Sequence, residues 1–330
     1  MQRIALCLSV LAVAACGPKP PPNSNTAIPI PDGPGCPSAE STMVVVYHAA
    51  TATRPAGWSL PLANRRSEAS EERYDVLDPT AAAGAGIPTP PARLWVLQVG
   101  APPCEATSGA FFSHTVIDGP ANDVLGVELT TTCPAPASEQ AVQGIAVVAE
   151  ASPTGCVVLL PRPVAGRVAE EGSDTWKVLP QSTPMPPAVE AALPTKTCVA
   201  PCEELWTVSQ VDLSGSPLAW DAAVEWLHVD PAQPDPCQWA SEGDGGVLVA
   251  NADGSAARVD VPGASTQLHL AGALADRGGP KVLVLEHIGE YATLDLRAGA
   301  PPRLGRHLRW YLPNEELYAG DRKLGPYCGP

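Results

Sequence analysis

Proline constrains the fold of this chain more than any other feature, because 39 of its 330 residues are Pro and a further 29 are Gly. Proline lacks the amide donor that a helix interior or a central strand requires, and glycine loses more backbone entropy on folding than other residues. Long helices are therefore excluded. Short strands separated by turns are expected, and the length is sufficient for one large domain or two medium ones.

Short apolar and β-branched runs recur through the N-terminal half, each bounded by turn-forming residues. Six of them are predicted to be strands: Met43–Tyr47, Arg93–Val99, Phe111–Ile117, Val124–Thr131, Ile145–Ala149 and Cys156–Leu160. Strands of this length and spacing favour a sandwich-like or barrel-like unit. Short helices are predicted at Ala137–Gln143 and at Ala188–Leu193.

The C-terminal half alternates more regularly between apolar and polar residues. Leu205–Leu213 is predicted to be a strand, and Arg303–Leu312 is predicted to be the last one. Two hairpins are predicted, one joining Val247–Ala250 to Ala256–Val261 and the other joining Lys281–His287 to Tyr291–Leu296. Between them, Trp220 and Trp226 would lie near one face of a helix, where both rings suit packing.

These patterns predict a mainly β fold, made of disulfide-braced sandwich- or barrel-like β units with few short helices. The alternative is a degenerate β-propeller-like fold, because the stretches that begin at Asp212 and Asp276 faintly resemble the loops of FG-GAP-type propeller repeats. Several acidic or amide side chains bind calcium in those repeats. The alternating carboxylates are missing here, and a hard cation needs six or more oxygen ligands.

The first sixteen residues have the pattern of an export signal. Arg3 gives a short basic start, and Ile4–Ala15 is a largely apolar run of twelve residues. A helix needs about 20 apolar residues to span a bilayer core, so this run is too short for an ordinary membrane span. At its end, Val13-Ala14-Ala15-Cys16 resembles the lipobox of bacterial lipoproteins.

The resemblance implies that residues 1–15 are a lipoprotein signal peptide, cleaved between Ala15 and Cys16. It also implies that Cys16 carries a covalent lipid, with diacylglycerol and palmitate as its components, which anchors the exported protein to a membrane of the cell envelope. Gly17 follows the cysteine in place of Asp, and within this family that implies the outer membrane. The alternative is an ordinary signal peptidase, which would leave Cys16 as a thiol. No cofactor other than this lipid is expected.

The remaining chain is divided by its proline-rich stretches. Residues 16–35 hold the lipidated cysteine and a proline-rich tether, which suits an extended spacer. An N-terminal β-rich domain is then expected at 36–176, a proline-rich linker at 177–201 and a C-terminal β-rich domain at 202–330. The alternative is that the two halves share one core.

Eight cysteines remain once Cys7 leaves with the signal peptide and Cys16 takes the lipid: Cys36, Cys104, Cys133, Cys156, Cys198, Cys202, Cys237 and Cys328. An even number in an exported chain predicts four disulfides, with the first four cysteines pairing among themselves and the last four likewise. Cys198 and Cys202 could instead belong to a metal site. Zinc needs four ligands, however, and no neighbouring pair completes the set.

A net charge of −15 repels phosphate backbones, so nucleic acid is not expected as a partner. Four arginines nevertheless lie close together around His307: Arg297, Arg303, Arg306 and Arg309. Because guanidinium groups bind carboxylates and phosphates, these residues are candidate contacts for an anion or a glycan. The alternative is a solvated strand face whose arginines pair with the chain's own carboxylates.

The sequence contains no motif that specifies catalysis or a metal site. It lacks Gly-x-Ser-x-Gly, His-Glu-x-x-His and the glycine-rich phosphate-binding loops, and its six histidines are never at metal-ligand spacing. The nearest constellation is Glu286, His287 and Glu290. On a strand, however, Glu286 and His287 would point to opposite faces. No catalytic residue is therefore assigned.

Three functions are compatible with these observations. The leading hypothesis is a membrane-anchored envelope lipoprotein with a non-enzymatic structural or binding ectodomain, whose partner would be a protein or a glycan. The second is a secreted hydrolase whose active site is assembled from distant residues. The third is a metal- or calcium-binding envelope module centred on Cys198, Cys202 or the Gly-Asp turns.

Overall fold

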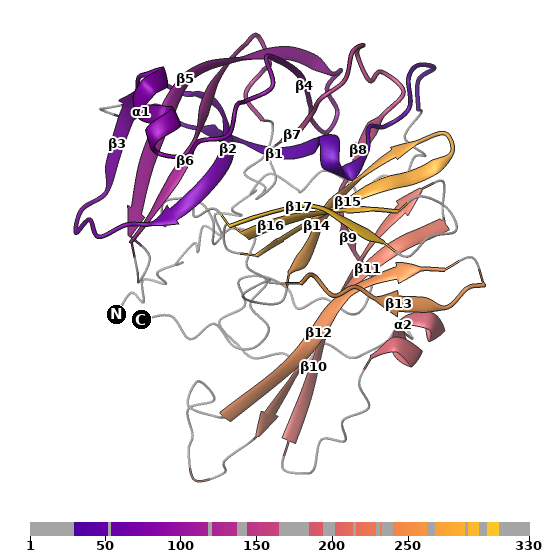
Figure 1. The fold of residues 1–330 in the computed structure, drawn as a ribbon. Helices are drawn as coiled ribbons and strands as arrows, with labels where there is room; N and C mark the ends of the chain where they lie inside the picture. Colours follow the sequence, from indigo (N-terminus) through magenta and orange to yellow (C-terminus); the bar gives the residue numbers. More distant parts are fainter. Residues whose placement is uncertain are drawn as a thin grey trace, which may run out of the picture.

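The computed structural model describes residues 30–51, 54–117, 121–136, 144–164, 185–193, 202–213, 216–228, 232, 240–251, 253–262, 268–287, 290–296 and 302–309. The fold is mainly β, with 57% strand and 8% helix, which confirms the predicted class. Its strands form a closed barrel and two further sheets (Figure 1). Barrel and sheets are stacked, and no radial blades of the propeller alternative are found among the described strands.

Six antiparallel strands close into the barrel. They are β1 (Thr42–His48), β2 (Gly57–Arg66), β4 (Arg93–Leu97), β5 (Cys104–Ile117), β6 (Ala121–Thr131) and β7 (Gly144–Val147). Their order is β5-β4-β7-β1-β2-β6, and the pairing of β6 with β5 completes the circle. A further strand, β3 (Arg73–Leu77), extends the wall by pairing with β5.

Alternate residues of the barrel strands point inward and form its core. This set includes Trp58, Leu60, Leu94, Val96 and Val127, each of which is at most 2% exposed. The interior is therefore packed with side chains, as expected for a barrel of so few strands.

The other two sheets have five strands each. One has the order β17-β16-β15-β14-β8 and consists of β8 (Val157–Leu159), β14 (His269–Asp276), β15 (Gly279–His287), β16 (Glu290–Asp295) and β17 (Arg303–Arg309). The other has the order β13-β12-β11-β10-β9 and consists of β9 (Arg162–Pro163), β10 (Cys202–Leu213), β11 (Ser216–His228), β12 (Ala240–Ala250) and β13 (Ala256–Arg258). We call them the middle sheet and the outer sheet.

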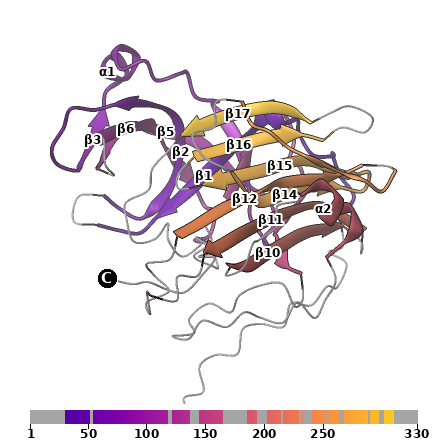
Figure 2. The same cartoon turned by 90° about the horizontal axis from the view of Figure 1, so that it is seen from below.

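The middle sheet lies between the barrel and the outer sheet (Figures 1 and 2). On one side, Val284 belongs to a buried apolar cluster with Val46 on the outer face of the barrel. On the other side, Leu285 belongs to a cluster with Val247 of the outer sheet. Alternation along β15 thus directs neighbouring residues into two different cores.

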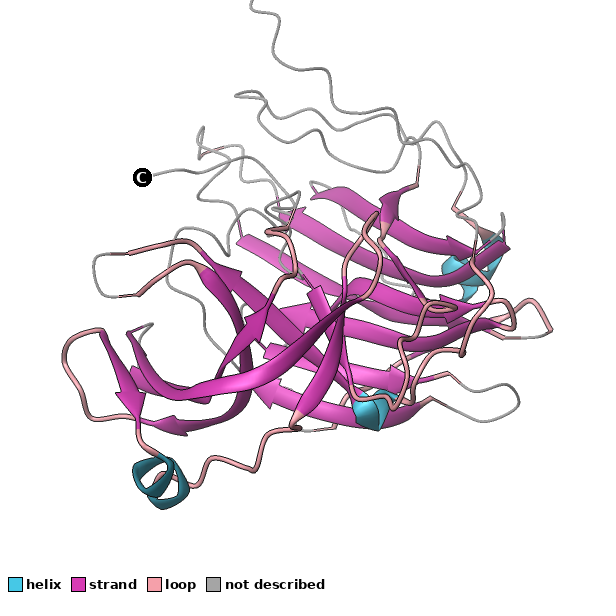
Figure 3. Ribbon diagram, turned by 90° about the horizontal axis from the view of Figure 1, so that it is seen from above, coloured by secondary structure: helices cyan, strands magenta, loops and turns pink. Residues whose placement is uncertain are grey.

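The helices are short and peripheral (Figure 3). Helix α1 (Pro79–Gly84) begins after Asp78, whose carboxylate accepts hydrogen bonds from the N–H groups of Thr80 and Ala81. Helix α2 (Pro187–Ala192) buries Val189 against the far face of the outer sheet. A single 3-10 turn, η1 (Ala39–Ser41), precedes β1.

Each predicted strand is found, although β5 begins earlier than expected, at Cys104. Both predicted hairpins are present, and the helix at 188–193 corresponds to α2. The helix suggested around Trp220 and Trp226 is wrong, because this segment is strand β11 and pairs with β10 and β12. A separation of six residues also places both indoles on one face of a strand. The helix expected at 137–143 lies outside the described residues.

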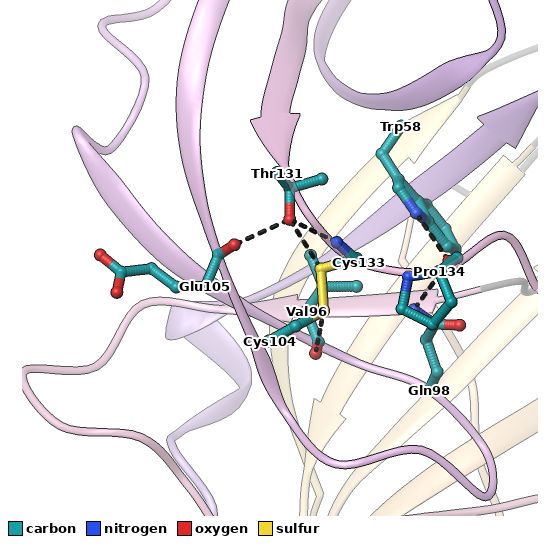
Figure 4. Close-up of a disulfide and its surroundings, with 8 residues drawn as sticks. All are labelled: Trp58, Val96, Gln98, Cys104, Glu105, Thr131, Cys133 and Pro134. Carbon is teal, nitrogen blue, oxygen red and sulfur yellow. Dashed lines mark hydrogen bonds between the residues drawn. A yellow bond between two sulfur atoms is a disulfide. The ribbon is translucent and has the colours of Figure 1, made fainter.

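Two disulfides join the first four candidate cysteines, as predicted. Cys36 is bonded to Cys156, and Cys104 is bonded to Cys133 at one end of the barrel (Figure 4). The second bond fixes the segment after β6, where the Pro134 carbonyl accepts hydrogen bonds from Trp58 Nε1 and Gln98 Nε2, both at 3.2 Å.

The pairing expected among the last four candidate cysteines stays a prediction. Cys198, Cys237 and Cys328 lie outside the described residues, and the side chain of Cys202 is not described.

The division into two domains stays a prediction. The strands β8 and β9 come from the N-terminal half, yet they pair with β14 and β10 of the later sheets. Among the described residues, no helix is long and apolar enough to cross a membrane.

Candidate functional site

A proline in strand β2 separates two neighbouring strands of the barrel. β1 and β2 pair only from Val46↔Ser59 to His48↔Gly57, and the same register, if continued, would bring Val45 opposite Leu60 and then Val44 opposite Pro61. Pro61 has no N–H to donate, and the pairing of β2 with β6 is irregular between Pro61 and Ala63. The two strands therefore diverge beyond this point.

The gap between the diverging strands forms a pocket of about 180 Å³, which we call the seam pocket. Its walls are residues 42–44 of β1 and 61–62 of β2 from the barrel, together with 291–293 of β16 and 306–308 of β17 from the middle sheet. The pocket thus lies where the barrel meets the middle sheet, and its walls come from parts of the sequence that are far apart.

Hydrogen bonds fix the far wall of the seam pocket. The Thr293 hydroxyl donates to the Ala39 carbonyl at 3.0 Å and accepts from the Arg306 N–H at 3.0 Å. Arg306 Nε donates to the Glu40 carbonyl at 2.9 Å. Since Ala39 and Glu40 belong to η1, these bonds hold β16 and β17 against the turn that leads into β1.

Glycine at position 305 permits this close approach. A Cβ atom built on Gly305 would lie 2.5 Å from the Ala39 Cβ, which is closer than such atoms come in proteins. Any side chain at this position would push β17 away from η1 and widen the seam.

A buried carboxylate supports another wall residue of the pocket. Glu290 is 2% exposed, and its Oε1 lies 2.6 Å from His307 Nε2. A buried carboxylate needs such a partner, because desolvation without one is costly. The pair also fixes the orientation of the His307 ring, which is one-quarter exposed or less.

Arg306 differs from most of the described arginines in its partner, although Arg66 and Arg303 likewise have no carboxylate partner among the described residues. Most of these arginines pair with a carboxylate: Arg54, Arg65, Arg73, Arg93, Arg162, Arg258 and Arg277. Arg306 contacts the Glu40 carbonyl instead and has no carboxylate partner within the described part of the chain. A cation without a counter-charge at the wall of a pocket can receive an anion.

The structure separates the four arginines that the sequence groups together. Arg303 and Arg306 are both exposed, but only Arg306 lines the seam pocket, whereas Arg303 lies opposite Asp295 and is not part of the wall. Arg309 ends β17, but its side chain is not described, and Arg297 lies outside the described residues.

A second group of ionisable side chains lies on the outer face of the barrel, and we call it the Glu128 cluster. Glu128 Oε2 lies 3.1 Å from His48 Nε2, and its Oε1 accepts from Arg54 Nη2 at 2.7 Å and from the Tyr74 hydroxyl. The guanidinium of Arg54 also lies over the rings of Tyr74 and Phe112, 4.6 and 5.2 Å from their centroids.

The electrostatics of the Glu128 cluster follow from these contacts. Burial opposes ionisation of Glu128, but hydrogen bonds from His48 and Tyr74 and the charge of Arg54 outweigh it and hold its pKa below the usual value. Burial and the Glu128 contact raise the pKa of Tyr74 well above its usual value. Burial and the charges of Arg54 and His48 lower the pKa of His114 to about 4.

The polar groups of the Glu128 cluster bind one another. Its carboxylate binds an arginine, a histidine and a tyrosine, and Arg54 ties the segment after β1 to the barrel wall. Sequence reasoning did not find this cluster, because its members come from β1, β3, β5 and β6 and from a loop. No local spacing relates them.

Two further acidic side chains that the sequence singled out have protein partners. Asp276 Oδ1 accepts from Gly278 N–H at 2.8 Å and faces Lys281 Nζ at 3.5 Å. Asp212 Oδ2 accepts from both Arg162 Nε, at 2.8 Å, and Arg162 Nη2. Both carboxylates are therefore bound by nitrogen donors of the protein, and Asp212 Oδ1 is buried without a hydrogen-bond partner among the described residues. Among the described residues, no group of three or more His, Cys, Asp or Glu could hold a metal ion.

The sequence grouped Glu286, His287 and Glu290, but in the structure Glu290 contacts a histidine of another strand. Glu290 pairs with His307 of β17, and the side chain of His287 is not described. Another histidine, His269, lies 3.2 Å from the buried Asp221 of the outer sheet. Three of the described histidines, His48, His269 and His307, thus have a carboxylate partner.

No protein-family model, no curated protein and no solved structure matches this chain. Its function is therefore inferred from its own residues.

Proposed function

We propose that this protein is a lipoprotein of the bacterial cell envelope, anchored through Cys16, whose folded part is a non-enzymatic binding ectodomain. The sequence Val13-Ala14-Ala15-Cys16 at the end of a short apolar run carries this proposal. A lipid with more than one acyl chain gives stable anchoring, whereas a single chain gives only marginal binding.

The disulfides support the proposed location. Disulfides persist in oxidising compartments outside the cytoplasm and are rare inside it. The Cys36–Cys156 and Cys104–Cys133 bonds therefore agree with export. The acidic net charge is also in accord with a protein that does not bind nucleic acid.

The attachment of the tether to the folded part suits an anchored protein. Arg277 Nε donates to the Ile30 carbonyl at 3.2 Å, and its guanidinium pairs with Asp32. The Cys36–Cys156 disulfide follows a few residues later. From Cys16 to Ile30 the chain can span at most about 50 Å, so the ectodomain would stay within that distance of the lipid surface.

A binding role rests on the seam pocket. The pocket combines an apolar wall with one cation that has no carboxylate partner among the described residues. Sites for small molecules are typically apolar pockets with a few placed polar groups.

Metabolic labelling tests the anchoring. The full chain is produced in a bacterium with two membranes and grown with labelled palmitate, and the variants Cys16→Ala and Cys7→Ala are treated identically. We expect label in the unaltered chain and in Cys7→Ala, and none in Cys16→Ala, which should also leave the membrane fraction. An unlabelled wild-type chain, or label that survives Cys16→Ala, would contradict the proposal.

A further inference from the structure

We propose that the seam pocket binds a small carboxylate with a compact apolar body, of the size of benzoate. This inference rests on the proposed binding role of the ectodomain, and it adds the chemical class of the ligand. Three observations carry it: the volume of the pocket, the apolar part of its wall and the state of Arg306.

The volume limits the ligand to about the size of one ring. The pocket measures about 180 Å³. A protein cavity of about 150 Å³ with apolar walls is known to accept benzene, whereas drug-sized ligands need about 300 Å³ or more. A monocyclic acid therefore fits, and a long acyl chain or an oligosaccharide does not.

The barrel side of the pocket is mainly apolar, although Thr42 also lines it, with its hydroxyl donating to the Ser38 carbonyl at 2.9 Å. Met43, Val44, Pro61 and Leu62 lie there, and Leu308 adds to it from β17. Burying a ring against these side chains would contribute roughly 25 cal/mol per Å² of apolar area. This part of the wall selects an apolar body and gives no reason for a sugar, whose hydroxyls would lose their partners in water.

Arg306 supplies the charge that selects a carboxylate. Its Nε is bonded to the Glu40 carbonyl, while its terminal nitrogens have no partner among the described residues. These nitrogens have the planar spacing that binds both oxygens of a carboxylate. No aspartate or glutamate lines the pocket, so nothing in its wall repels an anion. Two carboxylates act on residues of this wall from outside the pocket: Glu290 is bound to His307, and the charge of Glu286 acts on Tyr291.

The diverging strands add backbone groups. Residues 42–44 of β1 pair with β7 on one side, and on the pocket side they have no partner among the described strands. Strand backbone directs N–H and C=O groups to both of its edges. A bound ligand can therefore exchange hydrogen bonds with β1 without any rearrangement of the barrel.

The test is equilibrium binding of benzoate to the full chain purified in detergent, with protein-free micelles as the reference. Benzyl alcohol and benzylamine serve as probes of the same shape with a different charge. We expect saturable binding of benzoate at one site per chain and at least tenfold weaker binding of both other probes. Absence of saturable benzoate binding, or equal binding of benzylamine, would overturn the proposal.

Two variants localise the binding. Arg306→Met should weaken benzoate binding at least tenfold, and Arg306→Lys should restore part of it, because lysine keeps the charge but not the paired nitrogens. Arg303→Met is the matched control, since Arg303 lies on the same strand, is exposed and does not line the pocket. Benzoate binding should change less than twofold in that control. Equal effects of Arg306→Met and Arg303→Met would show that only general charge is involved and would overturn the assignment.

The outcome is separable from that of the proposed function. Cys16→Ala removes the lipid and should leave benzoate binding unchanged. A chain that carries palmitate but does not bind benzoate contradicts only the proposed ligand class. A chain that binds benzoate but carries no palmitate contradicts only the proposed anchoring.

Discussion

Gly305 of β17 lies against Ala39 of η1 so closely that a Cβ on the glycine would come within 2.5 Å of the alanine Cβ. The two residues are far apart in the sequence, and their contact sets the width of the seam between the barrel and the middle sheet. The shape of the seam pocket therefore depends on a single missing methyl group.

Gly305→Ala should lower the free energy of unfolding by about 1–3 kcal/mol, because the added methyl group overpacks the seam. Urea denaturation followed by circular dichroism measures this loss. Gly84→Ala is the matched control, since a Cβ at Gly84, in α1, meets nothing within 4 Å. That variant should keep or slightly raise stability. Equal stability of the two variants would show that β17 does not depend on this contact.

Glu128→Gln should destabilise the barrel by about 2 kcal/mol, because it leaves Arg54 and His48 without their counter-charge in a largely buried cluster. Glu105→Gln is the control. Glu105 pairs with Arg93 on the same barrel, but about half of each side chain is exposed, so the loss there should be about 0.5 kcal/mol or less. The same denaturation experiment compares the two. A loss in Glu105→Gln as large as that in Glu128→Gln would contradict the importance of the cluster.

His114 should make stability fall as the pH is lowered from about 6.5 to about 4. Its pKa is about 4 in the folded chain, against an ordinary value of 6.5, so the unfolded chain binds a proton in this window that the folded chain does not. The loss amounts to about 3 kcal/mol at 1.36 kcal/mol per pKa unit. Glu128 acts in the same direction at lower pH, because its pKa is lowered by folding and its contribution disappears as it is protonated.

Titration of the His114 ring by NMR checks this directly, with His114→Gln used to assign the signal. The midpoint should lie near 4, and His114→Gln should flatten the dependence of stability on pH between 6.5 and 4. A midpoint between 6 and 7 would show that the ring is not buried beside Arg54 and His48.

The two disulfides should contribute unequally. In the chain-entropy account, a bond that closes a longer loop removes more freedom from the unfolded chain. Cys36 and Cys156 are separated by 120 residues, and Cys104 and Cys133 by 29. Replacing both cysteines of a pair by serine should therefore cost about 5 kcal/mol for the first pair and about 4 kcal/mol for the second. Denaturation midpoints in the reverse order would show that native packing around Cys104 outweighs loop length.

Local patterns were sufficient to predict much of the β structure, and the misses have identifiable causes. Runs such as Val124–Thr131 are β-branched and bounded by turns, so strand is their only consistent interpretation. Strand β2 escaped prediction because Pro61 lies within it, and a proline argues against a paired strand. β11 was assigned to a helix, although six residues of a helix turn through about 600° and leave Trp220 and Trp226 about 120° apart. Only the strand period of two places both indoles on one face. β3 and β14 were not predicted at all.

The candidate site was only partly accessible from sequence. Arg306 was identified as a charge in an acidic chain, but nothing local shows that it differs from Arg303. That difference arises because η1 binds Arg306 and because Pro61 opens the barrel wall opposite it, and both depend on contacts between distant segments. The Glu128 cluster has the same origin, since five segments of the chain contribute to it.

The intact mass of the mature chain, extracted from membranes and analysed with its N-terminal peptide, tests the central claim most directly. The lipoprotein proposal predicts that residues 1–15 are absent and that the first residue is Cys16 bearing acyl chains. A chain that begins at any other residue, or that begins at Cys16 with an unmodified thiol, would contradict it.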